Sequence, residues 1–269
     1  FINKSSEEMQ EIEALAAGLK AYTTWHTTAT LQECREACGG KGYLSENRID
    51  ALKNDTEVYS TFEGDNTVLM QLVAKNRLSV FRKAFSDIDS MGKVNYVWNQ
   101  TKIILSETSP LITRDISESH LLNREFHLNA FYYREHEIVT SAARRIKKLI
   151  NSGLNAYDAF NVVQHQMVDV AKAYLDRVVL EQFLTKIDEI EDKNSKAMLE
   201  KLAQLFALHK MEENKAWYLE NNYLETVKTK AIRKMVNQLC WEIRPDAVAL
   251  VDAFGIPESC LAAPIAEKI

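Results

Sequence analysis

The sequence predicts an all-α protein made of two helical bundles. Glycine and proline are scarce, at 8 and 4 of 269 residues, so breaks between helices are few. Apolar residues recur at spacings of three and four, and nowhere do they alternate with polar residues as in a strand or hairpin. Pro110 and a lack of periodicity mark residues 107–118 as a linker. This linker divides the chain into a domain over 1–106 and a second over 119–269.

The first bundle is expected to begin with a helix over residues 5–38. Ser5 or Ser6 followed by glutamates is a capping signal, and Gly39-Gly40 is a typical helix end. Residues 39–62 then form a long connection with one short helical turn near 55–59. The buried stripe expected on this helix comprises Ile12, Leu15, Leu19 and Tyr22.

A second helix is expected to begin after Gly64, where Asp65 and Asn66 are favourable N-terminal residues. Met91-Gly92 ends it, and a further helix covers about 94–106. The buried stripe expected on the second helix comprises Val68, Leu69, Leu72, Val73, Phe81 and Phe85.

The second bundle is predicted from its apolar stripes and their terminators. Asn151-Ser152-Gly153 ends the first helix, and Arg244-Pro245 ends the last long one, because the residue before proline avoids helical geometry. The basic run Arg144–Lys148 is predicted to face solvent rather than to bind a phosphate group or an acidic partner. The stripes comprise Ile138, Val139, Ala142, Ala143, Ile146, Leu149 and Ile150, then Leu180, Phe183, Leu184 and Ile187, then Leu199, Leu202, Leu205 and Phe206, and finally Ile232, Met235, Val236, Leu239 and Ile243.

Composition narrows the class of protein. The net charge of −5 argues against general nucleic-acid binding, which needs a basic surface. No apolar run approaches the roughly 20 residues that span a bilayer. The polar opening FINKSSEEMQ is not a signal peptide, and because it lacks an initiator Met we expect a piece of a longer protein.

No complete metal site is expected. Cys34 and Cys38 lie four residues apart, but no second Cys or His pair completes a zinc set. We interpret them, with Cys240 and Cys260, as buried small residues in a reducing compartment. The six histidines include no Glu-x-x-His pair, so a di-iron bundle is not expected either.

The most informative stretch is 34–75, which holds four of the eight glycines: Gly39, Gly40, Gly42 and Gly64. Such a cluster either ends a helix or lets a large ligand approach the backbone. Glu63 lies at its far end between Phe62 and Gly64, and Gly64 leaves space beside it for a substrate. Glu63 is therefore a candidate base for removing a proton from carbon. The alternative is a solvated glutamate in the first turn of a helix.

The same stretch resembles the acyl-CoA oxidases, within the acyl-CoA dehydrogenase superfamily. The matching segments are AGLKAYTTWHTTATLQECREACGGKGYL and TFEGDNTVLMQLVAK, in the same order and spacing, over about residues 17–75. The resemblance implies FAD as cofactor, fatty acyl-CoA as substrate and Glu63 as catalytic base. The products would be a trans-2-enoyl-CoA and, from O2, H2O2, as in fatty acid β-oxidation. Phe62 and Gly64 would form the wall of the substrate pocket.

The resemblance gives roles to four more residues. Gly39 and Gly40 would lie against the FAD of a partner subunit. Asp65 and Thr67 match positions where the dehydrogenases, which usually carry Thr and Gln there, contact FAD.

The second bundle resembles the C-terminal helical domain that distinguishes oxidases from dehydrogenases. In the family this domain covers surface that dehydrogenases bury in tetramers, which implies a homodimer. The N-terminal helical domain and the middle β-domain of the family are not in this sequence. We therefore interpret the chain as the C-terminal portion of an oxidase, inactive by itself. Two alternatives stay open: a dehydrogenase that uses an electron-transfer flavoprotein, and a non-catalytic helical interaction module.

The compartment expected from the sequence is a bacterial cytoplasm. Oxidases of this kind are often peroxisomal, but Glu267-Lys268-Ile269 is not a Ser-Lys-Leu-type address. The peroxisome is therefore the second choice.

Overall fold

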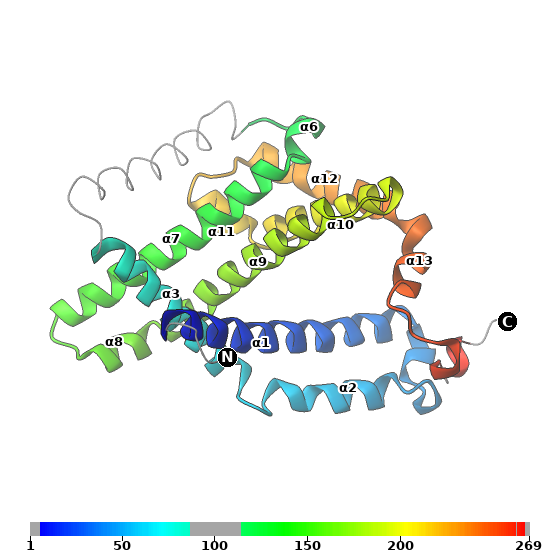
Figure 1. Ribbon diagram of the computed structural model, residues 1–269, viewed down its shortest axis with the longest axis horizontal. Coiled ribbons are helices and arrows are strands. Elements are labelled where there is room, and N and C mark those ends of the chain that lie inside the picture. The colour runs from blue at the N-terminus through cyan, green and yellow to red at the C-terminus, as the bar shows by residue number, and fades with distance from the viewer. Residues whose placement is uncertain (1–5, 87–113, 262, 267–269) are drawn as a thin grey trace. The chain divides into compact units, whose positions relative to one another are not determined.

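The computed structural model describes residues 6–86, 114–261 and 263–266. Every regular element in these residues is a helix, which confirms the all-α prediction (Figure 1). The described chain forms two compact units: one runs up to Arg77 and resumes at Ala249, and the other runs from Leu78 to Val248. The expected break at Met91-Gly92, the helix over 94–106 and most of the linker lie outside the described residues, and the domain boundaries stay a prediction.

The first unit is built on one long helix, α1 (Ser6–Ala37), with α2 packed along it (Figure 1). The elements after α1 are, in order, η1 (Gly39–Tyr43), η2 (Ser45–Asn47), α2 (Ile49–Glu57), η3 (Val58–Ser60) and α3 (Asn66–Ser86). The long connection expected over 39–62 is therefore wrong, since α2 occupies nine of its residues. Ala51 and Leu52 are strong helix formers, and Lys53 pairs with Glu57 one turn later.

The first part of α3 runs antiparallel to α1. The Asn66 side chain reaches the carbonyl of Ala21 at 3.4 Å, and the Asn76 side chain reaches the carbonyl of Gln10 at 3.3 Å. A side chain of one helix can reach the backbone of the other only where the neighbouring side chains at the contact are small. From Glu8 to the end of α1, the buried residues are accordingly Ala14, Gly18 and Ala21.

The packing of α3 on α1 buries other residues than the two predicted stripes on these helices. Val73 of α3 is buried as predicted, and Met70 and Ala74 of the same helix are buried too. The residues predicted to be buried that are instead exposed are Leu19, Val68 and Leu72, with exposed fractions of 42%, 60% and 45%. Both helices carry apolar residues on more than one face, so periodicity identified the helices but not the face that the neighbouring helix covers.

In the second unit, α9 packs against α7 and α10, and α10 packs against α12. Its elements are α6 (Glu118–Leu121), α7 (Arg124–Asn151), α8 (Ala156–Val162), α9 (Gln164–Asp188), α10 (Lys193–Glu213), α11 (Lys215–Glu220) and α12 (Thr226–Ile243), followed by η4 (Arg244–Asp246). The next helix, α13 (Ala247–Asp252), begins in this unit and continues after Val248 into the residues of the first unit. Side-chain oxygens of Asn123, Asn155 and Asp192 accept hydrogen bonds from backbone N–H groups in the first turns of α7, α8 and α10. These caps explain where the three helices begin.

The predicted helix ends in this unit are confirmed. α7 ends at Asn151, and Gly153 follows with a φ of 105°. α12 ends at Ile243, before Pro245, and all five residues of its predicted stripe are buried. In α10 the stripe is wrong in detail: the predicted leucines are only half-buried, and the buried residues are Ala203, Ala207, Leu208 and Met211.

The buried His127 of α7 makes the stability of the fold depend on pH. Its Nε2 lies 2.7 Å from the Leu121 carbonyl, which can only accept, so Nε2 carries the proton. Burial lowers the pKa of His127 from 6.5 to about 4. The unfolded chain therefore binds a proton first as the pH falls. Stability should be fully present above about pH 6.5 and decline by up to about 3 kcal/mol as the pH approaches 4.

We expect His127→Gln to remove this part of the pH dependence, since an amide can still donate to Leu121 but does not titrate in this range. The measurement is urea unfolding of the chain at several pH values, with exposed His165 changed to Gln as the control. An unchanged slope in His127→Gln would contradict the assignment.

Gly42→Ala should destabilise the first unit by about 1–3 kcal/mol or more. A Cβ built at Gly42 would lie 2.1 Å from the backbone oxygen of Arg35, which cannot move without disturbing the end of α1. Gly40→Ala is the matched control, because a Cβ there meets nothing within 4 Å. Thermal unfolding of the two variants checks the contrast, and equal melting temperatures would count against it.

Candidate active-site turn and glycine turn

The turn that carries Glu63 has an unusual backbone. Glu63 has a φ of 58° and Gly64 a φ of 107°, so two consecutive residues are left-handed. Such a conformation costs on the order of 1 kcal/mol or more for a residue with a side chain. It directs Glu63 and its neighbour Phe62 outward, and both are exposed, Phe62 to 57%.

The structure explains Gly64 differently from the sequence. A Cβ on Gly64 would lie 3.1 Å from a methyl carbon of Leu69, so the expected open space beside Gly64 is already filled on that side. The left-handed backbone is the reason for glycine here.

Asp65 is the N-cap of α3, as its position predicted. Its Oδ1 accepts hydrogen bonds from the backbone N–H groups of Thr67 at 2.9 Å and Val68 at 3.3 Å. This fixes the carboxylate at the start of the helix, while Thr67 is exposed next to it. Asp65 and Thr67 therefore lie on the same turn as Glu63, and their FAD contacts stay a prediction.

Lys20 and Asn66 hold this turn on α1. The Nζ of Lys20 donates to the carbonyl oxygen of Gly64 at 2.7 Å and to Oδ1 of Asn66 at 2.9 Å. Asn66 is only 1% exposed, and its Nδ2 donates to Oγ1 of Thr24 at 2.9 Å. Sequence reasoning recognised Asn66 only as a helix start and missed Lys20, because a contact over 44 residues leaves no local signal.

The glycine turn η1 follows the end of α1. Gly39 has a φ of 57°, whereas Gly40 does not have a left-handed backbone. A Cβ at either position would meet nothing within 4 Å. Both are exposed, whereas Gly42 is buried. Neither contacts nor backbone angle in the first unit explain why residue 40 is a glycine, which leaves approach of another molecule as a reason.

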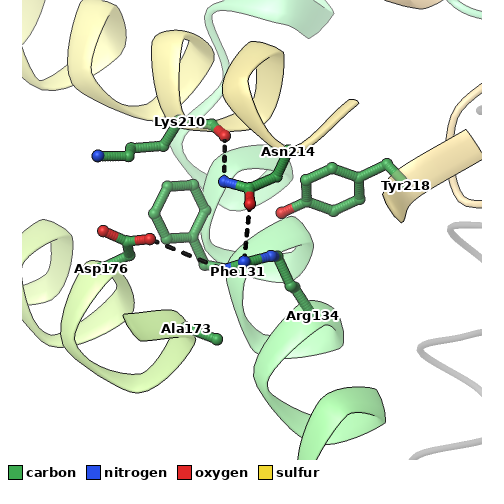
Figure 2. Close-up of a pocket in the computed structure, with 7 residues that line it drawn as sticks. All are labelled: Phe131, Arg134, Ala173, Asp176, Lys210, Asn214 and Tyr218. Carbon is green, nitrogen blue, oxygen red and sulfur yellow. Dashed lines mark hydrogen bonds and ion pairs between the residues drawn. The ribbon is translucent and has the colours of Figure 1, made fainter. Parts of the chain in front are cut away.

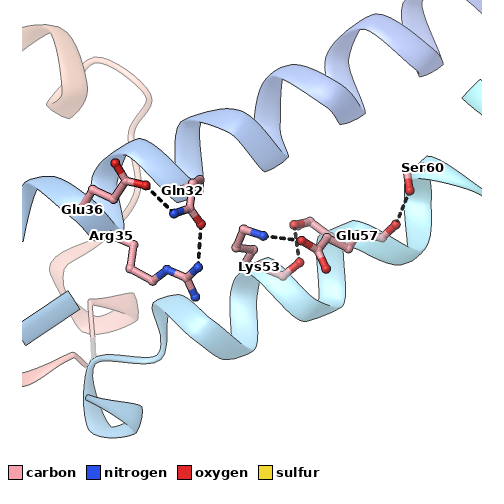
Figure 3. Close-up of polar contacts among 7 residues, drawn as sticks. Gln32, Arg35, Glu36, Lys53, Glu57 and Ser60 are labelled. Carbon is pink, nitrogen blue, oxygen red and sulfur yellow. Dashed lines mark hydrogen bonds and ion pairs between the residues drawn. The ribbon is translucent and has the colours of Figure 1, made fainter. Parts of the chain in front are cut away.

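Polar contacts fix the residues around η1. At the end of α1, Gln32 bonds both Glu36 and Arg35 at 2.6 Å (Figure 3). The Arg35 guanidinium lies over the Tyr43 ring. On α2, Figure 3 shows the separate pair of Lys53 with Glu57.

Asn47 joins the glycine turn to the end of the chain. It is 4% exposed, its Nδ2 donates to the Lys41 carbonyl at 2.7 Å, and its Oδ1 accepts from the backbone N–H of Ile265 at 2.9 Å. Ile265 belongs to η6 (Pro264–Ala266), which follows η5 (Glu258–Cys260). Residues more than 200 positions apart therefore shape one turn, which the sequence did not predict.

The structure brings the predicted site residues together in two groups rather than one. One group lies in the turn after α2 and comprises Phe62, Glu63, Gly64, Asp65 and Thr67. The other group, Gly39 and Gly40, lies in the glycine turn η1 before α2. The nine residues of α2 alone span about 14 Å. Helix α2 therefore separates the two groups along the chain, and the ligand contacts expected of each group stay a prediction.

A buried polar cluster in the second unit is the other feature that could suggest a site. Arg134 lies 3.7 Å from Asp176 and donates to Asn214 at 2.7 Å (Figure 2). The Tyr218 hydroxyl donates to the Ala130 carbonyl at 3.1 Å. Burial raises the pKa of Tyr218, so its hydroxyl stays neutral. The space between these side chains does not admit a water molecule. The cluster therefore joins α7 and α9 to the end of α10 and to α11, and it leaves no space for a ligand.

Metal ligands do not gather in the part of the chain that the structure describes. There, no group of three or more His, Cys, Asp or Glu side chains could hold a metal ion. The predicted burial of the cysteines is wrong: Cys38 is half-buried, and Cys34, Cys240 and Cys260 are exposed. Neighbouring helices cover other faces of α1 and α12, which leaves Cys34 and Cys240 at the surface. Within the same described residues, no helix is long and apolar enough to cross a membrane.

Two family models match the chain. The model described as "Acyl-CoA oxidase" matches residues 123–268, and the one described as "Acyl-CoA oxidase, C-alpha1 domain" matches residues 2–78. The second match contains both turns described above, and the first contains most of the second unit.

Individual proteins agree with these models. The chain is 35% identical over 256 residues to acyl-coenzyme A oxidase 2, peroxisomal, of Arabidopsis thaliana, covering 95% of this chain but only 37% of that protein. The crystal structure of acyl-CoA oxidase 3 from Yarrowia lipolytica is similar with a TM-score of 0.83 and 28% identity, covering 96% of this chain and 36% of that one.

A more distant structure, acyl-CoA oxidase 1 of Caenorhabditis elegans complexed with FAD and ATP, shares the fold with a TM-score of 0.78 at 20% identity, over 95% of this chain and 37% of that one. The chain thus spans a little over a third of the proteins it matches. Its two matched models, its all-helical fold and these relatives together show that the chain belongs to the acyl-CoA oxidase family and corresponds to the family's C-terminal region.

Proposed function

We propose that this chain is the part of an FAD-dependent acyl-CoA oxidase that supplies the catalytic base, Glu63. Family membership supports the reaction class. The observation that carries the residue assignment is the left-handed turn, which presents Glu63 outward while its backbone is bonded to α1 through Gly64 and Lys20. A base held on a fixed backbone can meet a substrate in a reproducible geometry.

In the proposed reaction, the Glu63 carboxylate takes a proton from the α-carbon of a fatty acyl-CoA. The β-carbon loses a hydride, and a trans-2-enoyl-CoA results. Bound FAD would supply the hydride acceptor and the route by which the electron pair reduces O2 to H2O2. Phe62, exposed beside the base, offers apolar surface to the substrate, and Gly64 would complete the pocket wall.

The glycine turn fits the flavin. Gly39 and Gly40 present backbone without side chains, and the positions of their missing Cβ atoms are open. The oxidase of Caenorhabditis elegans named above was solved with FAD. We assign Gly39 and Gly40 to contacts with FAD of a partner subunit. We also assign Asp65 and Thr67, which lie on the same turn as Glu63, to contacts with FAD.

The exposed apolar surface supports a homodimer with further domains around these turns. Tyr43 is 58% exposed and Leu44 47% exposed next to the glycine turn, and Val68 is 60% exposed next to the active-site turn. Burying such side chains is favourable. By itself the chain should be inactive, because Glu63 lies in water and nothing among the described residues excludes solvent from it.

The remaining alternatives concern the electron acceptor and the compartment. An electron-transfer flavoprotein would make the protein a dehydrogenase, and peroxide formation by the full-length protein separates the two. A bacterial cytoplasm was expected from the sequence. The Arabidopsis relative is peroxisomal by name, which supports the peroxisomal alternative.

Glu63→Gln in the full-length protein should lower the rate of acyl-CoA oxidation by at least about a hundredfold, because an amide cannot accept the α-proton. FAD content should not change. Peroxide release measures the rate, and Glu46→Gln, an exposed acid in η2, is the control. Near-normal activity of Glu63→Gln would mean that the base lies elsewhere, or that the chain is a non-catalytic module.

Gly40→Leu in the full-length protein should weaken FAD binding by at least about tenfold, since a side chain would occupy the space assigned to the flavin. The melting temperature of the isolated chain should hardly change, because a Cβ at residue 40 would meet nothing within 4 Å and the residue is exposed. Flavin titration of the apoprotein measures the affinity. Unchanged affinity would show that the flavin does not approach Gly40.

A further inference from the structure

Glu63 and Gly64 adopt backbone angles that isolated residues avoid. Their φ values of 58° and 107° place both in the left-handed region, and only the second is a glycine. Two such residues in succession persist only where surrounding contacts determine the conformation. The Glu63 side chain is exposed and cannot supply these contacts by burial.

Lys20 supplies two of the contacts from the middle of α1. Its Nζ donates to the Gly64 carbonyl oxygen at 2.7 Å and to Asn66 Oδ1 at 2.9 Å. One ammonium group therefore joins the residue immediately after Glu63 to the first residue of α3. Hydrogen bonds from a charged donor are stronger than neutral ones. The Lys20 side chain is half-buried, which limits competition from water.

Asn66 fixes the other side of the turn. Its side chain is 1% exposed, and Nδ2 donates to Thr24 Oγ1 at 2.9 Å and to the Ala21 carbonyl at 3.4 Å. Thr24 Oγ1 in turn donates to the Lys20 carbonyl at 2.8 Å. All the α1 residues in this network lie within a single turn of the helix. The network therefore fixes the position of the backbone around Glu63 relative to α1.

We propose that Lys20 and Asn66 are positioning residues for Glu63, acting through the Gly64 carbonyl and the start of α3 without contacting the substrate. This inference rests on the proposed function, in which Glu63 removes the α-proton. A base displaced by a fraction of an ångström loses much of its rate advantage. The loss should appear in proton removal and not in binding.

The test uses the full-length enzyme and compares Lys20→Met with Lys20→Arg. Lys20→Met should slow flavin reduction by acyl-CoA in anaerobic single-turnover experiments by about tenfold or more, with FAD content and acyl-CoA affinity unchanged. Lys20→Arg, which keeps charged donors, should recover most of the rate. Lys53→Met is the matched control, because Lys53 pairs with Glu57 within α2. A rate for Lys20→Met equal to that of the control overturns the proposal.

A double-mutant comparison separates positioning from general damage. If Lys20 acts through Glu63, adding Lys20→Met to Glu63→Gln should slow the residual rate no further. A further tenfold loss in that background overturns the inference while leaving Glu63 as the base. Normal activity of Glu63→Gln alone instead overturns the proposed function.

Thr24→Val keeps the test decisive if Lys20→Met does not fold. It removes the acceptor for Asn66 Nδ2 with little change in shape. Hydrogen exchange at Thr67 and Val68, whose N–H groups are bonded to Asp65, should speed up in Thr24→Val, and flavin reduction should slow. Exchange and rate both equal to those of the unmodified enzyme contradict the proposal.

Discussion

A single buried amide, that of Asn66, ties the start of α3 to the middle of α1. It is bonded on one side to Thr24 and on the other to Lys20, which also holds the carbonyl of Gly64. A buried amide left without partners is costly, so α3 can begin only where both sets of bonds form. The outward position of Glu63, the antiparallel course of α3 and the burial of Met70 and Val73 all follow from that starting point.

The turn that carries Glu63 and the glycine turn η1 present different surfaces, which the proposed reaction would use in different ways. One offers a carboxylate on a left-handed backbone, and the other offers bare backbone at Gly40. With α2 between them, one polypeptide could serve two ligand sites. This separation agrees with the proposal that the glycine turn meets the flavin of a partner subunit while Glu63 serves the substrate site. The exposed apolar residues next to both turns favour the same arrangement.

The ends and buried faces of the helices could be predicted from the sequence where the residues that determine them lie close together along the chain. The ends of α7 and α12 follow from Gly153 and Pro245, and the α12 stripe is buried as the periodicity predicted. α2 was missed because it is short and follows directly on the glycine turn η1 and on η2. The faces of α1 and α10 were misjudged for a shared reason. Close packing places small residues such as Ala21 and Ala207 at the contact, whereas a hydrophobicity pattern favours the larger leucines beside them.

The sequence by itself determined the all-helical class, the main helix ends and, through two segments of the first 75 residues, the resemblance to the acyl-CoA oxidases that the family models confirm. These properties depend on periodicity, capping and residue order, which are local. Only the tertiary structure decided that Lys20 and Asn66 hold the turn at Glu63, and that Asn47 joins the glycine turn to Ile265. Such hydrogen bonds link residues 44 to 218 positions apart, and their geometry exists only once the helices have packed.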